Sequence, residues 1–432
     1  MKNRRVVWLV LVIIAMAVAL ISLIPLHLFA PGNEVINNTP PVAPALREWR
    51  GSTGEFVVST NSHIVLDPVY SRQLQGTAQV FQQDFQAELN IRLPIVVSSD
   101  PGTSNFFLTL KTRDSGIGDE GYLLDIDTSV TLDAHSSTGI FYGTRSILQM
   151  LHAVSDHASL PKGYARDYPS YKERGFMLDV GRKFVPLSTL EDYVRLMAWY
   201  KFNDFQLHFN DNALGGGDKA DWQHQYAAFR LNSPAFPGLA ASDGSYTEQQ
   251  IKELEQVASA YHVTITPEID TPAHALALTQ YRPDLVSQSY SKEFLDLSNP
   301  ATTTFVNALW TTFLPWFSAS QINIGMDEYD ARDSDRYRQY INYYDAFLKK
   351  QGKSARMWGS LSEMPSNVKV NTDIVLEDWD NTWANSVDMA KQGFQIINAN
   401  DHLLYIVPHA DYFNDFLNTR LLYNSWEPYI FN

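Results

Sequence analysis

Short apolar runs alternate with amphipathic stretches through the second half of the chain, from Tyr171 onward. A short apolar run predicts a buried strand, and apolar residues that recur every three or four positions predict a helix. Strands are predicted at 175–180, 204–210, 263–269, 322–326, 355–358, 373–377 and 394–398, and helices at 187–200, 247–261 and 333–350. Strands that alternate with helices form parallel βαβ units.

The length of this second segment, 169–432, is close to the ~250 residues of an eight-stranded βα barrel. We therefore predict an α/β fold, a TIM-type (β/α)8 barrel. A doubly wound sheet is the alternative, but it usually opens with a glycine-rich phosphate-binding turn that fits nothing in this sequence. Because only seven strands are recognised, we expect the barrel to be incomplete at its C-terminal side.

The first half of the chain has a different pattern, with short strand-like runs around two helical stretches. Strands are predicted at 56–58, 63–66, 93–97, 105–110 and 122–126, and helices at 73–89 and 139–153. This pattern predicts a small accessory α+β domain at 51–168. Residues 31–50 are rich in Pro, Asn and Ala and are predicted to be a linker.

The first 30 residues carry Lys2, Arg4 and Arg5 in front of an apolar run at 6–24 that only Ser22 interrupts. Nineteen helical residues span about 28 Å, close to the hydrocarbon thickness of a bilayer. We predict a transmembrane signal anchor at 1–30 in the cell membrane, single-pass, with the rest of the chain outside. A cleaved signal peptide and a secreted protein are the alternative, although Pro31 makes the site after Ala30 a poor one.

Composition narrows the classes of function. The formal charge is −15, which argues against nucleic acid as a partner because phosphate backbones are bound by Lys and Arg. There is no cysteine, so disulfides, thiol nucleophiles and cysteine-ligated metals are excluded. No Gly-x-Ser-x-Gly elbow or zinc hydrolase motif occurs either.

The sharpest chemical feature is the pair Asp327-Glu328, which directly follows the predicted strand 322–326. Side chains alternate along a strand, so adjacent acids point apart unless the strand is ending. At the carboxyl end of a barrel strand, where catalytic residues gather, both acids can reach one site. Two carboxyl groups in different environments suit glycoside hydrolysis. The alternative is that Asp327 caps the next helix and Glu328 is solvated.

A second cluster lies at 266–274, where Glu268, Asp270 and His274 stand between prolines. His and carboxylates can ligate hard and borderline metal ions, so a metal site is conceivable here. No His-x-x-x-His pair is present to support it, and a rigid turn is the other interpretation. Polar and aromatic residues also end other predicted strands: Asp179, His208, Asp211, Trp358, Glu377, Trp379 and Asn398.

Several multi-residue motifs resemble glycoside hydrolase family 20. The motifs are 174–182 (RGFMLDVGR), 200–203 (YKFN), 207–211 (LHFND), 267–274 (PEIDTPAH) and 324–329 (IGMDEY), in the order in which the family has them. The preceding unit, with 120–124 (EGYLL) and 139–145 (GIFYGTR), looks like the family's accessory α+β domain.

The resemblance implies a retaining glycosidase that removes terminal β-linked N-acetylhexosamine by substrate-assisted catalysis through an oxazolinium ion. It implies that Glu328 is the general acid and base, and that Asp327 orients the 2-acetamido group and stabilises its charge. The other residues that it implies bind substrate or support the site are Arg182, Asp211, His274, Trp358, Trp379, Tyr405 and Trp426. It implies no metal and no organic cofactor, and its partners are glycans that contain N-acetylhexosamine.

The sequence departs from the family at two points. Met326 stands where a small residue is frequent, and no segment after Trp426 resembles the family's last strand, which carries a Trp followed closely by an acid. Two further functions also stay open. One is a lacto-N-biosidase, which releases a disaccharide, and the other is a non-catalytic glycan-binding remnant of a truncated barrel.

Overall fold

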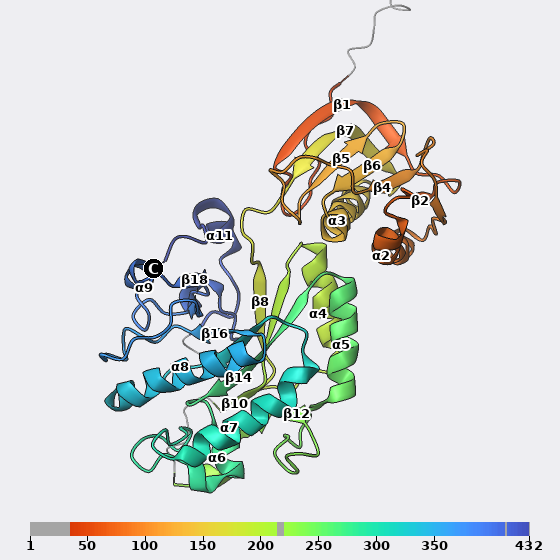
Figure 1. Ribbon diagram of the computed structural model, residues 1–432. Helices are drawn as coiled ribbons and strands as arrows, with labels where there is room; N and C mark the ends of the chain where they lie inside the picture. Colours follow the sequence, from red (N-terminus) through yellow and green to blue (C-terminus); the bar gives the residue numbers. More distant parts are fainter. Residues whose placement is uncertain (1–34, 214–219, 411–412, 432) are drawn as a thin grey trace, which may run out of the picture. The chain divides into compact units, whose positions relative to one another are not determined.

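The computed structural model describes residues 35–213, 220–410 and 413–431. The chain forms two compact units, one mainly up to residue 168 and one mainly from residue 169 on (Figure 1). The predicted membrane anchor at 1–30 lies outside the described residues. Among the helices that are described, none is long and apolar enough to cross a bilayer.

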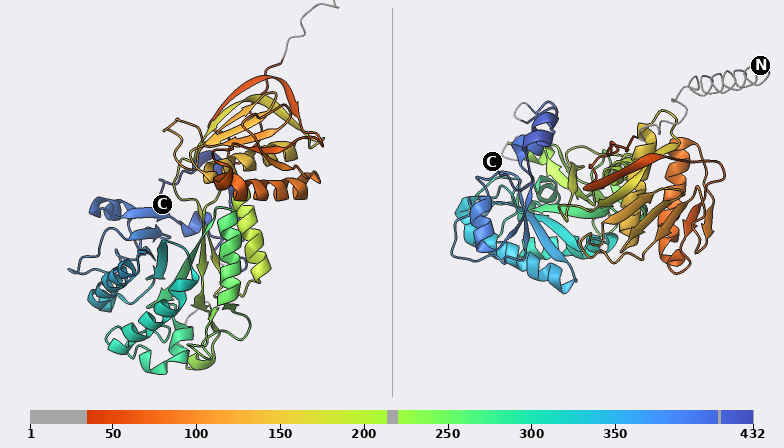
Figure 2. Two further views of the ribbon diagram at one scale, coloured as in Figure 1. Left: turned by 45° about the vertical axis from the view of Figure 1, so that its right-hand side comes forward. Right: turned by 90° about the horizontal axis from the view of Figure 1, so that it is seen from above.

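The first unit is built on a mixed seven-stranded sheet with the strand order β1-β7-β5-β6-β4-β2-β3. Two helices, α2 and α3, lie along one face of this sheet (Figure 2). The elements are β1 (Glu48–Val57), β2 (Ile64–Leu66), α2 (Ser71–Leu89), β3 (Ile95–Val97), β4 (Phe106–Thr109), β5 (Tyr122–Ile126), β6 (Val130–Ala134), α3 (Ser137–Ala153) and β7 (Ser159–Asp167).

Two strands of this unit, β6 and β7, were not predicted. β6 alternates buried and half-buried residues and pairs antiparallel with β5, so its alternation was a usable signal. β7 contains Pro161 and Gly163, which both weaken a strand pattern. Pro161 is tolerated because it lies opposite Glu55, where the register of the β1–β7 ladder shifts.

The described part of the predicted linker is bonded to the first unit. Ile36 forms a bridge with Thr53, and the side-chain amide of Gln149 both donates to and accepts from the backbone of Ala43. The backbone N–H of Arg47 donates to the Asp167 carboxylate at 3.1 Å.

The second unit has seven parallel strands whose order in the sheet follows their order in the chain. They are β8 (Gly175–Asp179), β9 (Asp204–His208), β14 (Thr264–Thr271), β15 (Gln321–Gly325), β16 (Ser354–Trp358), β17 (Val375–Asp378) and β18 (Gln395–Asn398). Sequential parallel order is the topology of a TIM-like barrel, since a doubly wound sheet reverses its order at a switch point. All seven strands were predicted, with bounds that differ by at most two residues, and the structure confirms them.

Longer and shorter elements connect these strands. The helices are α4 (Leu187–Trp199), α5 (Glu248–Ala260), α6 (Leu276–Tyr281), α7 (Pro300–Phe313), α8 (Ser334–Lys350), α9 (Ser386–Gln392), α10 (Asp401–Leu404) and α11 (Thr419–Ser425). Short strands are β10 (Asn210–Asn212), β11 (Ala227–Phe229), β12 (Leu231–Asn232) and β13 (Tyr246–Thr247). α5 begins with a capping box in which Thr247 and Gln250 satisfy each other's backbone N–H groups.

β8 and β18 are the two edges of the described sheet, which is therefore an open barrel.

The interior of the barrel is polar as well as apolar. Buried Arg356 on β16 donates to Asp204 on β9 at 2.7 Å and to Glu377 on β17 at 3.3 Å. Gln206 donates to both Glu268 and Glu377, at 2.8 and 3.0 Å. Burial raises the pKa of Glu377 to about 8, against the attraction of Arg356. Side chains from four strands are thus joined inside the barrel, from Asp204 at the start of β9 to Glu377 near the end of β17.

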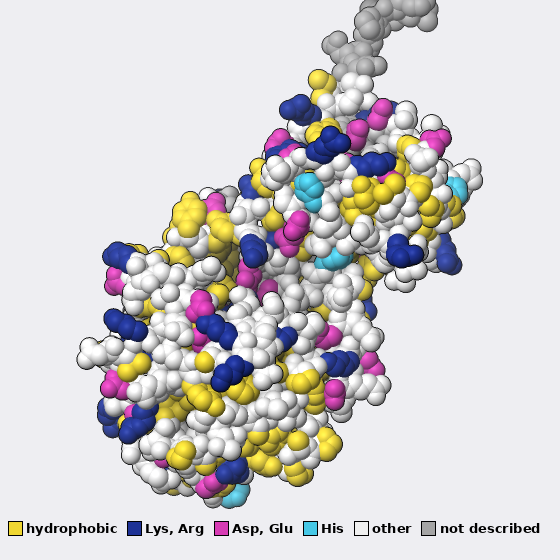
Figure 3. Space-filling view, viewed as in Figure 1, with side chains coloured by type: hydrophobic (Ala, Val, Ile, Leu, Met, Phe, Trp, Pro, Cys, Tyr) yellow, Lys and Arg dark blue, Asp and Glu magenta, His cyan; other side chains and the backbone are white. Residues whose placement is uncertain are grey.

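On the face shown in Figure 3, neither positive nor negative side chains are concentrated in one region of the surface. Lys and Arg side chains are interspersed with Asp and Glu on both units (Figure 3). This distribution agrees with the acidic net charge and offers no basic stripe for a phosphate backbone on this face.

Candidate active site

A tight backbone turn after β15 presents Asp327 and Glu328 to one site. Gly325, Met326 and Glu328 all have positive φ angles, of 76°, 79° and 48°. The N–H of Met326 donates to the Thr271 carbonyl at 3.1 Å, and the Tyr337 hydroxyl donates to the Met326 carbonyl. Left-handed backbone is unfavourable for a residue such as Met, so the surrounding bonds must hold it there. The turn breaks the strand alternation that would point the two acids apart.

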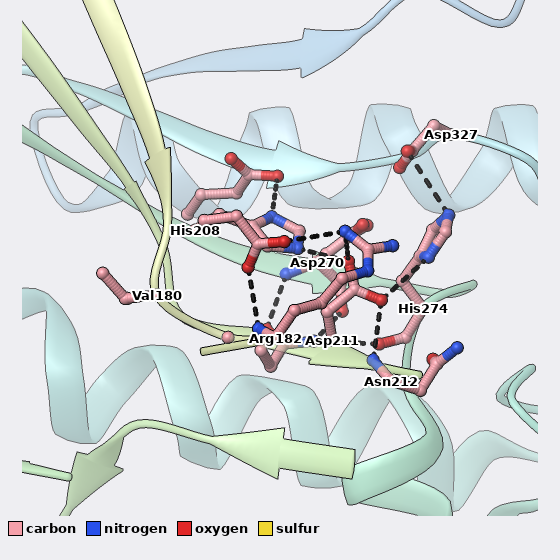
Figure 4. Close-up of polar contacts among 12 residues, drawn as sticks. Val180, Arg182, His208, Asp211, Asn212, Asp270, His274 and Asp327 are labelled. Atoms are coloured by element: carbon pink, nitrogen blue, oxygen red, sulfur yellow. Dashed lines mark hydrogen bonds and ion pairs between the residues drawn. The ribbon is translucent and has the colours of Figure 1, made fainter. Parts of the chain in front are cut away.

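The imidazole of His274 joins both acids. Its Nε2 lies 3.0 Å from Glu328 Oε2 and 3.5 Å from Asp327 Oδ2, and its Nδ1 lies 3.1 Å from Asp211 Oδ1. Figure 4 shows His274 between Asp327 and Asp211. Three residues of the sequence-predicted site, from two different segments, therefore surround one ring.

Asp211 on β10 is the centre of the supporting contacts. Its buried carboxylate lies 2.7 Å from His208 Nε2 and 2.7 Å from a guanidinium nitrogen of Arg182. Arg182 also lies 2.8 Å from the carboxylate of Asp179, at the end of β8. Asp211, held by His208 and Arg182, thus binds the ring nitrogen of His274 that faces away from the two acids.

Two residues that were not assigned to the site extend these contacts. Glu268 Oε1 lies 2.7 Å from His208 Nδ1 and accepts a hydrogen bond from Trp358 Nε1, also at 2.7 Å. A continuous chain of contacts therefore runs from Trp358 through Glu268, His208, Asp211 and His274 to Glu328. His208 and Glu268 end predicted strands and lie within the motifs 207–211 and 267–274, which was the available signal, but nothing in those motifs distinguishes a supporting role from a core role.

The contacts shift the ionisation of these groups. Burial alone would raise the pKa of Asp211, but His274, His208 and Arg182 hold it well below its usual value. Burial alone would lower the pKa of His274, and the surrounding carboxylates of Asp211, Asp327 and Glu328 raise it well above its usual value. The hydrogen bond from His274 lowers the pKa of Glu328. In the free protein, a proton shared by His274 and Glu328 therefore resides mainly on His274.

Asp327 differs from Glu328 in its surroundings. Burial raises the pKa of Asp327, while His274 opposes this shift. The side chain of Asp327 is 18% exposed and that of Glu328 is 46% exposed. Two adjacent carboxyl groups are thus held in different environments, and in the free protein the raised pKa belongs to Asp327 and the lowered pKa to Glu328.

The predicted aromatic residues come from the last part of the chain: Trp358 ends β16, Trp379 follows β17, Tyr405 follows α10 and Trp426 follows α11. The charge of Asp327 contributes to the raised pKa of Tyr405, whose main cause is burial, so the two groups are close. Half-buried Trp379 packs near Trp383, with ring centroids 5.9 Å apart. The segment after Trp426 is held at the end of β18, because Asn398 donates to the carbonyl of Pro428 at 3.1 Å. That Trp379 and Trp426 line a sugar pocket stays a prediction.

The metal-site interpretation of the 266–274 cluster concerns two groups of side chains. Ligand atoms of Asp270, His274 and Asp327 lie within 4.8 Å of one another, and so do those of His208, Glu268 and Asp270. Both nitrogens of His208 are already bonded to carboxylates, so His208 has no free ligand atom. Both nitrogens of His274 also lie within hydrogen-bond distance of carboxylates, so the first group has no free histidine nitrogen either.

The family comparisons cover nearly the whole chain. The catalytic domain of glycosyl hydrolase family 20 matches residues 171–428, and domain 2 of the same family matches residues 39–168.

Curated relatives are similar over most of this chain. A lacto-N-biosidase from Bifidobacterium bifidum is 25% identical over 414 residues, which cover 89% of this chain and 35% of that protein. A beta-hexosaminidase from Vibrio furnissii is 26% identical over 68% of this chain and 54% of its own length. A beta-N-acetylhexosaminidase from Cellulomonas fimi is 25% identical over 75% of this chain and 66% of its own. The chain thus spans about a third to two thirds of these relatives.

Solved structures share the fold. A GH20 beta-N-acetylhexosaminidase from Streptomyces coelicolor A3(2) superposes with a TM-score of 0.75 at 20% identity, covering 91% of this chain and 83% of that one. A mutant beta-hexosaminidase from Streptomyces plicatus in complex with its product GlcNAc superposes with a TM-score of 0.74 at 20% identity, covering 89% and 79%.

Proposed function

The chain belongs to glycosyl hydrolase family 20, and from this membership we propose that it is a retaining glycosidase that removes terminal β-linked N-acetylhexosamine from glycans. The observation that carries the proposal is the placement of His274 Nε2, 3.0 Å from Glu328 and 3.5 Å from Asp327. One imidazole thereby supports a proton-transferring acid and a second carboxylate of different environment, which is the pair that substrate-assisted hydrolysis requires.

In the first step, the carbonyl oxygen of the substrate's own acetamido group attacks the anomeric carbon while Glu328 gives its proton to the departing glycosidic oxygen. The product is an oxazolinium ion and a free alcohol. Asp327 orients the acetamido N–H and stabilises the positive charge that develops on it. Because this nucleophile is part of the substrate, its effective molarity is high. In the second step, Glu328 takes a proton from water, and the oxygen of that water opens the ring with overall retention.

The proton for the first step comes through His274. Substrate binding removes water from Glu328, and desolvation favours a neutral carboxyl group. The proton then moves from His274 Nε2 to Glu328 Oε2 across their 3.0 Å contact. Asp211, held by His208 and Arg182, keeps the imidazole in place while it changes its charge.

The proposal is tested with purified protein and aryl β-N-acetylglucosaminide, aryl β-N-acetylgalactosaminide and aryl β-lacto-N-bioside. Hydrolysis of a monosaccharide substrate, with the β-anomer as the first product in proton NMR, is the expected result. Glu328→Gln should abolish turnover of an unactivated linkage, and exposed Glu363→Gln serves as the matched control. Release of the α-anomer first, or full activity of Glu328→Gln, would overturn the proposal.

A second candidate function is release of a disaccharide. The observation that favours it is a protein named as a lacto-N-biosidase, which is 25% identical to this chain over 89% of the chain's length. The same assay decides, because turnover of the aryl lacto-N-bioside without turnover of the monosaccharide substrates would assign this activity. Binding of an oxazoline-like inhibitor without turnover of any substrate would instead identify a non-catalytic glycan-binding protein.

For localisation, we propose that the apolar run at 6–24 anchors the protein in the cell membrane with its folded units outside. The support is the sequence alone: a bilayer-length apolar run behind Lys2, Arg4 and Arg5. The full chain should stay in the membrane fraction after an alkaline wash, and a chain lacking residues 2–30 should not. Recovery of the full chain in the medium, with a new N-terminus near residue 31, would indicate cleavage instead.

A further inference from the structure

Asp270 is a buried acid that the mechanism above does not use. It lies near the end of β14, and its neighbour Thr271 pairs with Gly325 on β15, two residues before Asp327. Ligand oxygens of Asp270 and Asp327 lie within 4.8 Å of each other and of a nitrogen of His274. Asp270 is 0% exposed. Figure 4 shows it deep in the same group of side chains.

Three oxygens of this pair of carboxyl groups lack a hydrogen-bond donor among the described residues. Within the described parts of the chain, Oδ1 and Oδ2 of Asp270 and Oδ1 of Asp327 have no hydrogen-bond partner. Nearly all buried polar atoms in native proteins are satisfied, so three unsatisfied oxygens in one place need an explanation. A proton shared by the two groups, a bound water molecule or a bound cation would satisfy them.

The backbone prevents Asp270 from moving away. Its N–H donates to Asn210 Oδ1 at 2.9 Å, and its carbonyl accepts from Asn210 Nδ2 at 2.9 Å. Its carboxylate also lies against the backbone of Gly325, where an added Cβ would come within 1.8 Å of Asp270 Oδ1. Asp327 is held in turn by the bonds of Met326 to Thr271 and Tyr337. The backbones that carry the two carboxyl groups are therefore held next to each other.

Charge decides where a shared proton resides. Two carboxylates that share a buried site cannot both ionise, so one pKa is strongly raised. His274 lies 3.5 Å from Asp327 and stabilises its anion, whereas no ion pair involves Asp270 among the described residues. Asp327 also keeps some solvent contact, which Asp270 lacks. The shared proton should therefore reside on Asp270. In agreement, burial and then the charge of Asp327 raise the pKa of Asp270 well above its usual value.

We propose that Asp270 is a neutral, protonated carboxylic acid that donates a hydrogen bond to Asp327. It is a positioning residue: it fixes the rotamer of Asp327 and keeps Asp327 as the single anion facing the acetamido nitrogen. This role rests on the proposed function, because it gives Asp327 its charge and direction for that reaction. The state of the Asp270 proton, however, can be measured without any substrate.

The first test compares two substitutions. The side-chain amide of Asp270→Asn is the same shape as a protonated carboxyl group and can donate the same hydrogen bond, so kcat should stay within about 3-fold of wild type. Asp270→Ala removes the donor, and kcat should fall by about 10- to 100-fold with a smaller change in KM, the scale of losing one hydrogen bond to a charged group. A similar loss in both variants would overturn the proposal.

The second test uses infrared spectroscopy on protein labelled with ¹³C-aspartate at neutral pH. The wild type should show a protonated carboxyl band that is absent in Asp270→Asn and present in the control Asp388→Asn, which alters an exposed acid. If the band is present but no glycoside is hydrolysed, the proposed function fails while the protonation state stands. If Asp270→Asn leaves the spectrum unchanged, the proton assignment is wrong.

The competing occupant of the gap is a divalent cation held by Asp270, His274 and Asp327. Calorimetric titration with Zn²⁺ separates the two explanations, because a metal ligand must be anionic and Asp270→Asn would remove it. We expect that the wild type and Asp270→Asn give the same result in the Zn²⁺ titration. Tight Zn²⁺ binding that is lost in Asp270→Asn would replace the proton by a metal site and overturn the proposal.

Discussion

The two sides of the candidate site are built differently. On the acid side, from β8 to β15, the groups that support Glu328 are bonded to other side chains. The Asp211 carboxylate, for example, contacts three side chains: His208, His274 and Arg182. On the aromatic side, from β17 to α11, the indole N–H groups of Trp379 and Trp426 have no hydrogen-bond partner among the described residues.

The difference separates preorganisation from binding. Charges that are fixed before the substrate arrives need no reorganisation during the reaction, so the acid side should determine kcat. Aromatic faces and free indole donors bind a sugar by stacking and hydrogen bonding, so the aromatic side should mainly determine KM. Trp358 is the exception, because its Nε1 is bonded to Glu268 and so belongs to the acid side.

The strongest test of this division is removal of the acid. In Glu328→Gln, kcat/KM for an unactivated glycoside should fall by about 10³-fold, the usual scale of general acid–base catalysis. For an aryl glycoside with a good leaving group the loss should be much smaller, because that oxygen needs little help from a proton. Steady-state kinetics on both substrates measure the ratio, and equal losses would remove Glu328 from the acid role.

The next effect concerns pH. The pKa of His274 is raised well above its usual value, so the His274–Glu328 pair should keep its proton above pH 6.5, and we expect activity to be lost as the pH rises through the raised pKa. In His274→Gln only Glu328 can hold the proton, so the alkaline limb of kcat/KM should move down toward the ordinary Glu pKa of about 4.3, with about 10²-fold less activity at pH 7. An alkaline limb that stays where it is in wild type would show that His274 does not supply the proton.

A smaller loss should follow from releasing His274. Asp211→Asn replaces the anion between His208, Arg182 and His274, and we expect kcat to fall by about 10- to 30-fold and the melting temperature to decrease, as a buried charged contact is lost. Asp179→Asn also removes a contact of Arg182, but does not touch His274. It should therefore keep most of kcat, and equal kcat values for the two variants would argue against the positioning of His274 by Asp211.

The smallest effect is expected on the aromatic side. Trp379→Phe keeps a ring but removes the indole N–H, and KM should rise by about 5- to 10-fold with little change in kcat, the scale of one hydrogen bond. Trp383→Phe, at the neighbouring ring 5.9 Å away, is the matched control. A fall in kcat without a change in KM would place Trp379 with the preorganised side and break the comparison.

The sequence predicts the strands of the barrel well because each is a short apolar run, and three clear helical patterns, at 187–200, 247–261 and 333–350, separate some of them. It also predicts that polar residues end those strands, which brings Asp211, His274, Asp327 and Glu328 together in the structure. Parallel strands in sequential order leave little freedom in where their carboxyl ends meet.

The details of the site could not be predicted in the same way. Whether Asp327 and Glu328 reach one site depends on positive φ angles at Gly325, Met326 and Glu328, which no residue pattern announces for Met or Glu. The roles of His208 and Glu268 depend on which side chain reaches them across the barrel, which is a tertiary fact. The missed strands β6 and β7 differ from each other, since alternation was visible in β6 but Pro161 and Gly163 obscured β7.

The central claim is that the substrate's own acetamido group is the nucleophile, oriented by Asp327. It is tested most directly by kcat/KM for aryl glycosides whose N-acetyl group carries zero, one, two or three fluorine atoms. Fluorine withdraws electrons from the carbonyl oxygen, so a nucleophilic acetamido group predicts a steep, progressive fall in kcat/KM along the series. Equal values for all four substrates would contradict the account, because a carboxylate nucleophile would not respond to the fluorines.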